Sequence, residues 1–165
     1  MAIEDGMKVL FLRMQPLWSM VDDVRRLVAS FCATACPGAE QEEQLALAAQ
    51  ELVQNAFAHA GASEIELRLE LDRFAGRARV SVTNACDPEQ IPLLRALVAR
   101  VQAQPDPLAG YLEAMRANPE GRGGLGLSRI RYEGELDLGV DVRGRRVTVH
   151  AAGPLSCGAG PNAVA

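Results

Sequence analysis

One polar stripe of a predicted helix carries the residues best suited to chemistry. Glu51, Asn55 and His59 recur every fourth residue, so a helix that turns every ~3.6 residues aligns them on one side. An asparagine oxygen can ligate Mg²⁺ without adding charge, and a glutamate one turn away can accept a proton from an attacking hydroxyl. The stripe therefore suits a nucleotide-phosphate site, although an ordinary solvated face of an amphipathic helix has the same pattern.

A glycine-rich run, Gly121-Arg-Gly-Gly-Leu-Gly-Leu127, is the second such feature. It matches the dinucleotide-binding spacing G-x-G-x-x-G, but it follows a polar, turn-prone segment and not a buried strand. No Lys-Ser or Lys-Thr pair follows it, as a Walker-type phosphate loop requires. Two interpretations remain. The run is either a mobile linker or a cradle in which main-chain N–H groups and a helix beginning near Leu125 bind phosphate, with Arg122 adding a charge.

Hydrophobic periodicity predicts the elements that must position these residues. Strands are expected at 7–14, 64–71, 77–84, 135–142 and 145–150, and helices from Pro16 onward and at 39–60, 91–104, 108–118 and 127–132. The apolar face of the first helix should comprise Trp18, Val21, Val24, Leu27, Val28 and Phe31. Hairpins join the strands, so the expected fold class is α+β: a two-layer sandwich of a mostly antiparallel (mixed) sheet with helices on one face.

The strand that ends at Asn84 and the segment after it have distinct expected roles. Side chains alternate along a strand, so Asn84 should share the buried side of Val80 and Val82. The two helical stretches within residues 87–120 form an insert that would serve as a lid. We therefore expect one domain over residues 1–152, with this lid at 87–120, followed by a flexible tail at 153–165.

Composition excludes several classes of function. The 165 residues carry a formal net charge of −4, with arginine interspersed among acids, which argues against nucleic acid as a partner. No signal-peptide pattern and no apolar run of ~18 residues is present, which predicts a cytoplasmic protein without a membrane partner. The four cysteines lack the spacing of a disulfide framework or a zinc site, so reduced packing residues and no structural metal are expected at Cys32, Cys36, Cys86 and Cys157.

Together, the stripe and the glycine run resemble the histidine-kinase-like (GHKL) ATPases. Residues 51–60 resemble the N box of that family and residues 121–127 its G2 box, and the order of elements is similar along most of the chain. The resemblance implies the histidine-kinase-like ATPase (Bergerat) fold, with ATP and Mg²⁺ as cofactors. It implies Glu51 as the catalytic base and Asn55 as the metal ligand. The nucleotide site would comprise Asn55, His59, Asn84, Arg122, Gly123, Gly124, Leu125 and Gly126.

Within that group the chain looks most similar to the stand-alone anti-sigma-factor serine kinases. The stretch Asp106-Pro-Leu-Ala-Gly-Tyr111 in the lid further resembles the SiaB-like regulators of bacterial partner switching. The implied function is an ATP-dependent Ser/Thr protein kinase that binds and phosphorylates a small antagonist (anti-anti-sigma-like) protein. The resemblance also implies a homodimer, and a sigma factor or other effector as a further partner.

The chain departs from the family pattern after the third predicted strand. Asn84 stands where the family has the Asp that reads adenine, and Cys86 and Pro88 stand near its expected glycines. The alternative is therefore a non-catalytic binding module whose degenerate nucleotide site leaves it to sequester a partner. A small-molecule sensor that uses the same pocket is a third interpretation. His59 has an alternative as well, since a cation near the C-terminal end of a helix interacts well with its exposed carbonyls.

Overall fold

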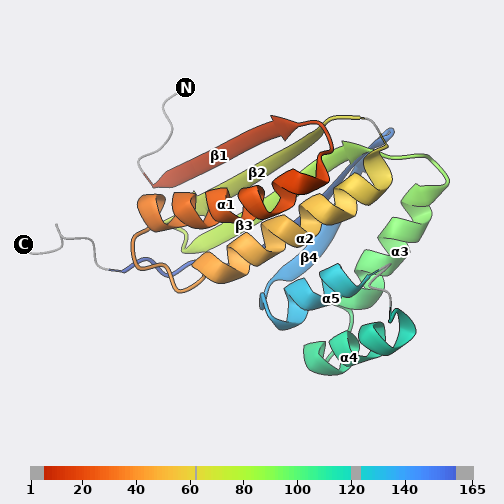
Figure 1. The fold of residues 1–165 in the computed structure, drawn as a ribbon. Coiled ribbons are helices and arrows are strands. Elements are labelled where there is room, and N and C mark those ends of the chain that lie inside the picture. The colour runs from red at the N-terminus through yellow and green to blue at the C-terminus, as the bar shows by residue number, and fades with distance from the viewer. Residues whose placement is uncertain (1–5, 62, 120–123, 159–165) are drawn as a thin grey trace, which may run out of the picture.

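The computed structural model describes residues 6–61, 63–119 and 124–158, which form a five-stranded sheet with a helical layer (Figure 1). The strand order is β1–β2–β3–β5–β4, and every pairing between these strands is antiparallel. The sheet is therefore not mixed in the part of the chain that is described. The strands are β1 (Met7–Met14), β2 (Ile65–Asp72), β3 (Arg77–Ala85), β4 (Asp137–Arg143) and β5 (Arg146–Pro154).

The helices confirm the predicted α+β class, with ends that differ from the expected ones by a few residues. Figure 1 shows α1 and α2 lying across one face of the sheet, and α3, α4 and α5 grouped at one end. None of the helices among the described residues is long and apolar enough to cross a bilayer. Their bounds are Trp18–Met20 for the 3₁₀ turn η1, then α1 (Val21–Ala35), α2 (Glu42–Ala60), α3 (Gln90–Gln102), α4 (Pro107–Ala117) and α5 (Leu125–Tyr132).

The core lies between the sheet and the pair α1 and α2. Side chains alternate in β2, and its inward residues Ile65, Leu67, Leu69 and Leu71 are completely buried. α2 begins with Glu42 and Glu43, whose charges favour the positive end of the helix. It ends at Gly61, whose φ of 61° is readily adopted only without a side chain. These two signals fix the length of the helix that carries the polar stripe.

The apolar face predicted for the first helix is only partly correct. Val21, Val24 and Val28 are buried, but Trp18 is 60% exposed and Leu27 is 43% exposed. The α-helix begins only at Val21, so Trp18 belongs to the preceding 3₁₀ turn and does not follow the 3.6-residue period. Leu27 lies outside the narrow apolar face of α1 that packs against the rest of the core. Trp18 instead packs edge-on against Phe57 of α2, with 5.6 Å between the ring centroids.

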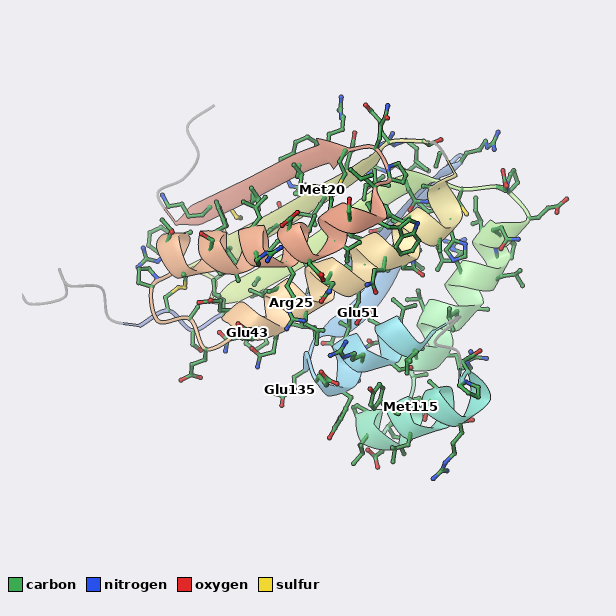
Figure 2. All side chains as sticks on the ribbon, viewed as in Figure 1. Met20, Arg25, Glu43, Glu51, Met115 and Glu135 are labelled. Atoms are coloured by element: carbon green, nitrogen blue, oxygen red, sulfur yellow. A yellow bond between two sulfur atoms is a disulfide. The ribbon has the colours of Figure 1, made fainter. Side chains whose placement is uncertain are left out.

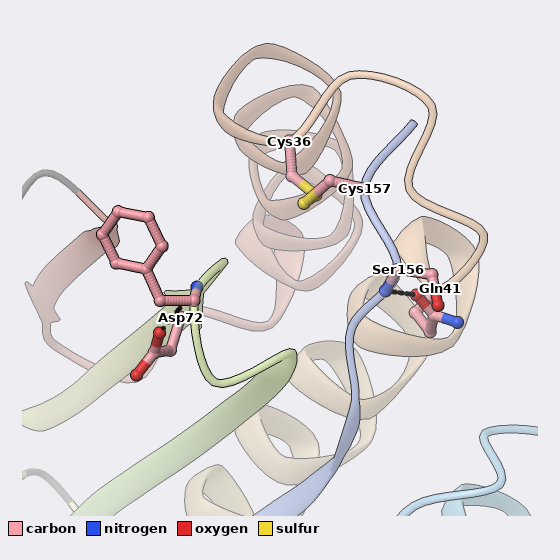
Figure 3. Close-up of a disulfide and its surroundings, with 6 residues drawn as sticks. Cys36, Gln41, Asp72, Ser156 and Cys157 are labelled. Carbon is pink, nitrogen blue, oxygen red and sulfur yellow. Dashed lines mark hydrogen bonds between the residues drawn. A yellow bond between two sulfur atoms is a disulfide. The ribbon is translucent and has the colours of Figure 1, made fainter. Parts of the chain in front are cut away.

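The expectation of four reduced cysteines is wrong for two of them. Cys36, at the end of α1, forms a disulfide with Cys157, which follows β5 (Figure 3). Cys32 and Cys86 are free and buried, as expected. Spacing rules detect only cysteines that are close in sequence, whereas this pair is separated by 121 residues and meets because β5 returns past the α1–α2 connection.

The folded part of the chain also extends further toward the C-terminus than expected. Gly153 and Pro154 belong to β5, and Leu155 is buried. The N–H of Ser156 donates to Oε1 of Gln41 at 2.8 Å, as Figure 3 shows, and the N–H of Gly158 donates to the carbonyl of Pro37 at 3.0 Å. Residues 153–158 are therefore part of the folded domain, while residues 159–165 of the expected tail lie outside the described chain.

Candidate functional site

A cavity of about 510 Å³ lies between α2 and the start of α5, and the predicted polar stripe forms one of its walls. Glu51, Asn55 and His59 of α2 all line it, which confirms that the helical spacing places them on one side. Gly124 and Gly126 line the facing wall at the start of α5. The remaining lining residues were not predicted as part of a site: Trp18, Gln54, Ala58, Leu97 and Leu127.

An ion pair joins the two walls of this cavity. Nη1 of Arg129 on α5 donates to Oε1 of Glu51 at 3.0 Å, and only 11% of the Glu51 side chain is exposed. Arg129 also contacts Glu133, the residue directly after α5, at 3.1 Å. Figure 2 shows Glu51 on the side of α2 that faces α5. The carboxylate of the stripe is therefore anchored, and the sequence contains no local signal for an arginine 78 residues away.

The environment of Glu51 also changes its proton affinity. Burial raises the pKa of the Glu51 carboxyl above its usual range, because a low-dielectric surrounding disfavours the charged form. The Arg129 charge and hydrogen bond oppose that rise. A carboxylate with a raised pKa is a stronger base than a solvated one, which is the property a general base requires.

Glycine is required at the start of α5 for two different reasons. At Gly126, a Cβ atom would lie 2.5 Å from Oε2 of Glu51, so a larger residue would force the carboxylate out of its present position. Gly124 has a φ of 95°, a backbone conformation that side chains rarely tolerate, and it precedes Leu125 at the first turn of the helix. The glycines thus allow close approach of the α5 backbone to α2, as a phosphate cradle also requires.

Two further stripe residues have accessible polar groups. Asn55 lines the cavity, and its side chain makes no hydrogen bond to another described residue. His59 lines the same cavity, is exposed, and lies in the last turn of α2, so both interpretations of its position fit the structure. An amide oxygen without a protein partner, one turn from a carboxylate, is a donor set that suits Mg²⁺.

Asn84 is not brought to the cavity. It is buried on the helix-facing side of β3 as expected, but it is absent from the cavity wall, and its Nδ2 donates to the carbonyl of Ala85 at 2.9 Å. The following residue, Cys86, donates its N–H to the carbonyl of Arg145 in the β4–β5 turn at 2.8 Å. The end of β3 is thus tied to its neighbouring hairpin. Leu125, also predicted, is the first residue of α5 and is absent from the cavity wall. Arg122 and Gly123, the last two predicted site residues, lie outside the described residues.

Comparison with known proteins agrees with this geometry. A family model described as the histidine kinase-like ATPase domain matches residues 16–131, which include both the stripe and the glycine run. A chain in the crystal structure of the SiaB–SiaC complex from Pseudomonas aeruginosa has a similar fold, with a TM-score of 0.63 and 15% identity over 92% of each chain. No curated protein matches the sequence. Because the matched segment covers most of the chain and holds both walls of the cavity, the protein belongs to the histidine kinase-like ATPase family.

Proposed function

We propose that the protein is an ATP-dependent serine/threonine kinase that binds and phosphorylates a small antagonist protein in a bacterial partner-switching pathway. One observation carries the proposal: the cavity sets Glu51 and Asn55 of α2 against the Gly124–Gly126 backbone of α5. A base, an oxygen ligand for a cation, and backbone N–H groups at a helix start are groups that phosphoryl transfer from a nucleotide uses. The family supports nucleotide binding, and the similar chain in the SiaB–SiaC structure supports a partner protein.

Each wall of the cavity would have its own task. Asn55 would hold Mg²⁺ through its amide oxygen, and the ion would neutralise phosphate charge when bound. The first turn of α5, from Gly124 to Gly126, would offer main-chain N–H groups to phosphate oxygens, with Arg122 and Gly123 preceding it. His59, at the far end of the stripe, would contact the nucleotide away from its phosphates.

Glu51 would orient the acceptor hydroxyl of the partner and accept its proton. Its two oxygens have different surroundings, since Oε1 is paired with Arg129 whereas Oε2 faces Gly126. Oε2 is therefore the atom that would accept the proton. Arg129 would fix the orientation of the carboxylate, and its position outside the cavity wall makes it a positioning residue.

A second candidate is a binding module in which the same cytoplasmic protein sequesters its partner without phosphorylating it. The observation that favours it is the location of Asn84, which is buried, bonded to the backbone of Ala85, and absent from the cavity wall. Among the described residues, no carboxylate other than Glu51 lines the cavity, so none is left to accept from an adenine amino group. The two candidates differ in whether Mg²⁺-ATP binds.

Titration of the purified chain with Mg²⁺-ATP by calorimetry separates the two candidates. Saturable binding supports the kinase, and no heat of binding supports the module. Asn55→Ala should weaken Mg²⁺-dependent binding. The matched control is Gln50→Ala, which also shortens an amide on α2 but faces Arg25 and Asp22 of α1. In wild type, ligand at 100 times its dissociation constant adds about 2.7 kcal/mol to stability. If Asn55→Ala gains the same stabilisation, Asn55 does not hold the metal.

Transfer is tested separately with Glu51→Gln, which keeps the size of the side chain and removes the base. Incubation with γ-labelled ATP and an extract of the host cell should label a small protein on serine or threonine. The variant should bind ATP normally and label that protein about 10²–10⁴-fold more slowly, the usual contribution of a general base. Undiminished labelling by Glu51→Gln would remove Glu51 from the reaction.

A further inference from the structure

The face of the sheet that α1 and α2 leave open carries a hollow of about 570 Å³ over β3, β5 and β4. Four arginines surround it: Arg79 from β3, Arg95 from α3, Arg143 from β4 and Arg146 from β5. We call this feature the arginine hollow. It shares no lining residue with the cavity that contains Glu51, so the proposed kinase site does not account for it.

Two of these arginines lie where like charges are unfavourable. Arg143 and Arg146 are directly opposite each other in the β4–β5 ladder, and like charges at such a position destabilise a sheet. Arg146 is paired with Glu66 at 2.8 Å, but Arg143 makes no ion pair with any described residue. An anion between the two guanidinium groups would relieve the repulsion, which gives the pair a physical reason to occur together.

The remaining arginines add to this excess of positive charge. Arg95 also makes no ion pair within the described chain, and Arg79 contacts Asp141 only at 3.5 Å. Asp141 is the one carboxylate that lines the arginine hollow among the described residues. This local excess occurs on a chain whose formal net charge is −4, so it does not reflect the general composition.

The other half of the same face is balanced. There, Glu66 accepts from Arg13 at 3.0 Å as well as from Arg146, and Arg68 is paired with Glu70 at 3.1 Å. β1 and β2 thus match arginine with glutamate, as a solvated sheet face normally does. Arg77, near the β2–β3 turn, also lacks an ion pair within the described chain, but it stands alone, whereas the arginine hollow brings Arg95 and Arg143 together without ion-pair partners.

Two hydroxyl groups between the arginines complete a set of anion donors. Thr83 and Thr148 are opposite each other in the β3–β5 ladder, and their Oγ1 atoms are 2.7 Å apart. A hydroxyl pair uses only one of its two protons for the bond between them, so the other proton can be donated to a ligand. Guanidinium forks and a free hydroxyl proton are the donors that a phosphate group with three terminal oxygens requires.

We propose that the arginine hollow binds the phosphate group of a phosphorylated ligand and is a second anion site, separate from the cavity between α2 and α5. The volume lies within the range of ~300–1,000 Å³ typical of small-molecule sites, so a phosphate monoester with its organic group fits. The phosphate belongs either to a small phosphorylated metabolite or to a phosphorylated side chain of a partner protein. Both sources present the same dianion to the arginines.

The test is a titration of the ¹⁵N-labelled full chain with inorganic phosphate, followed by NMR at an ionic strength held constant with sodium chloride. Saturable shifts of the β4–β5 amides are expected, and Arg143→Gln should weaken this binding by about tenfold. The matched control is Arg145→Gln, which removes the same charge from the same hairpin but from a side chain that is paired with Asp87 at 3.1 Å and lies outside the hollow. It should change the affinity by less than about twofold.

Three results of this titration would overturn the proposal. These are the absence of saturable shifts in the hairpin, equal shifts with chloride alone, and equal weakening by Arg145→Gln, which would reduce the effect to overall charge. Thermal unfolding gives a second measurement, since Arg143→Gln relieves the repulsion and should melt higher than wild type without phosphate and gain less when phosphate is added. A lower melting temperature for Arg143→Gln without phosphate would contradict the repulsion on which the site is argued.

Two further probes identify the source of the phosphate. Tighter binding of a phosphoserine peptide than of ribose 5-phosphate would indicate a partner protein, and the reverse order a metabolite. A glutamate-rich peptide that binds as tightly as either would overturn the phosphate assignment. Asn55→Ala, which alters the other cavity, should leave the hairpin shifts unchanged. Unchanged shifts would show that phosphate binding in the arginine hollow does not depend on the proposed kinase site.

Discussion

Two helices of the molecule, α2 at the candidate cavity and α4 in the 87–120 insert, are supported in very different ways. α2 buries ten residues, whereas α4, in the lid insert, buries none. The apolar side chains Leu108, Leu112 and Met115 of α4 are 41–46% exposed, and the helix rests mainly on α5 (Figure 1). α2, which forms one wall of the cavity, is thus on the side of the molecule that the core fixes, whereas α4 has little buried surface and contributes no residue to the cavity wall. An element with so little buried surface has low local stability.

The largest expected effect tests this contrast directly. Leu52→Ala, in the buried part of α2, should lower the free energy of unfolding by about 2–5 kcal/mol, because it leaves a cavity in the core. Leu112→Ala, on α4, should change it by no more than about 0.5 kcal/mol. Chemical denaturation measures both. Similar losses in the two variants would mean that α4 is as firmly supported as α2.

The disulfide offers a second test on the fixed side. Cys157→Ser should lower the free energy of unfolding by about 2–4 kcal/mol, since the bond restricts the unfolded chain over a long loop. Reductant should lower the melting temperature of wild type to that of the variant and leave the variant unchanged. If reductant leaves the melting temperature of wild type unchanged, the disulfide contributes nothing to the stability of the α1–α2 layer.

Asn84→Asp should also act on the fixed side, through the core and not through the cavity. Asn84 is only 4% exposed, and its Nδ2 donates to the Ala85 carbonyl. An ionised aspartate at this position would bury a charge and would have no proton to donate to that carbonyl. A loss of about 1–3 kcal/mol is expected at neutral pH, and it should shrink in acid as the carboxylate becomes protonated. Asp87→Asn, at an exposed pair with Arg145, is the control and should cost less than about 1 kcal/mol. Tighter ATP binding by Asn84→Asp without this loss would place Asn84 in the cavity.

The smallest expected effect concerns the contact between α2 and α5. Burial raises the pKa of Glu51 in the folded protein, so its protonated form favours folding at low pH, and this contribution is lost as the pH rises. Between about pH 4 and pH 7, wild type should therefore lose stability relative to Glu51→Gln. Denaturation across that range measures the difference, with Glu43→Gln on the exposed first turn of α2 as the control. If wild type instead gains stability relative to Glu51→Gln as the pH rises, the Arg129 contact affects the pKa of Glu51 more strongly than burial does.

Sequence reasoning predicted the parts of this molecule that depend on local periodicity. The Glu51–Asn55–His59 stripe is correct because three residues at helical spacing lie on one side whatever surrounds the helix. Alternation likewise placed Asn84 on the buried side of β3. What it missed depends on distant segments: Arg129 meets Glu51 across 78 residues. Trp18 was misplaced because the helix begins later than its apolar pattern suggests.

The disulfide divides the chain by how it would respond to mechanical force. Cys36 and Cys157 close a covalent loop that contains α2, all of the lid insert, α5 and every strand except β1. A pull applied to the two ends would pass through β1, α1 and the disulfide, and would bypass residues 37–156 between the cysteines. At ~3.4 Å per extended residue, about 400 Å of chain would bear no tension until the disulfide is reduced. Both walls of the candidate cavity lie within that shielded loop, so stretching would detach β1 and α1 first.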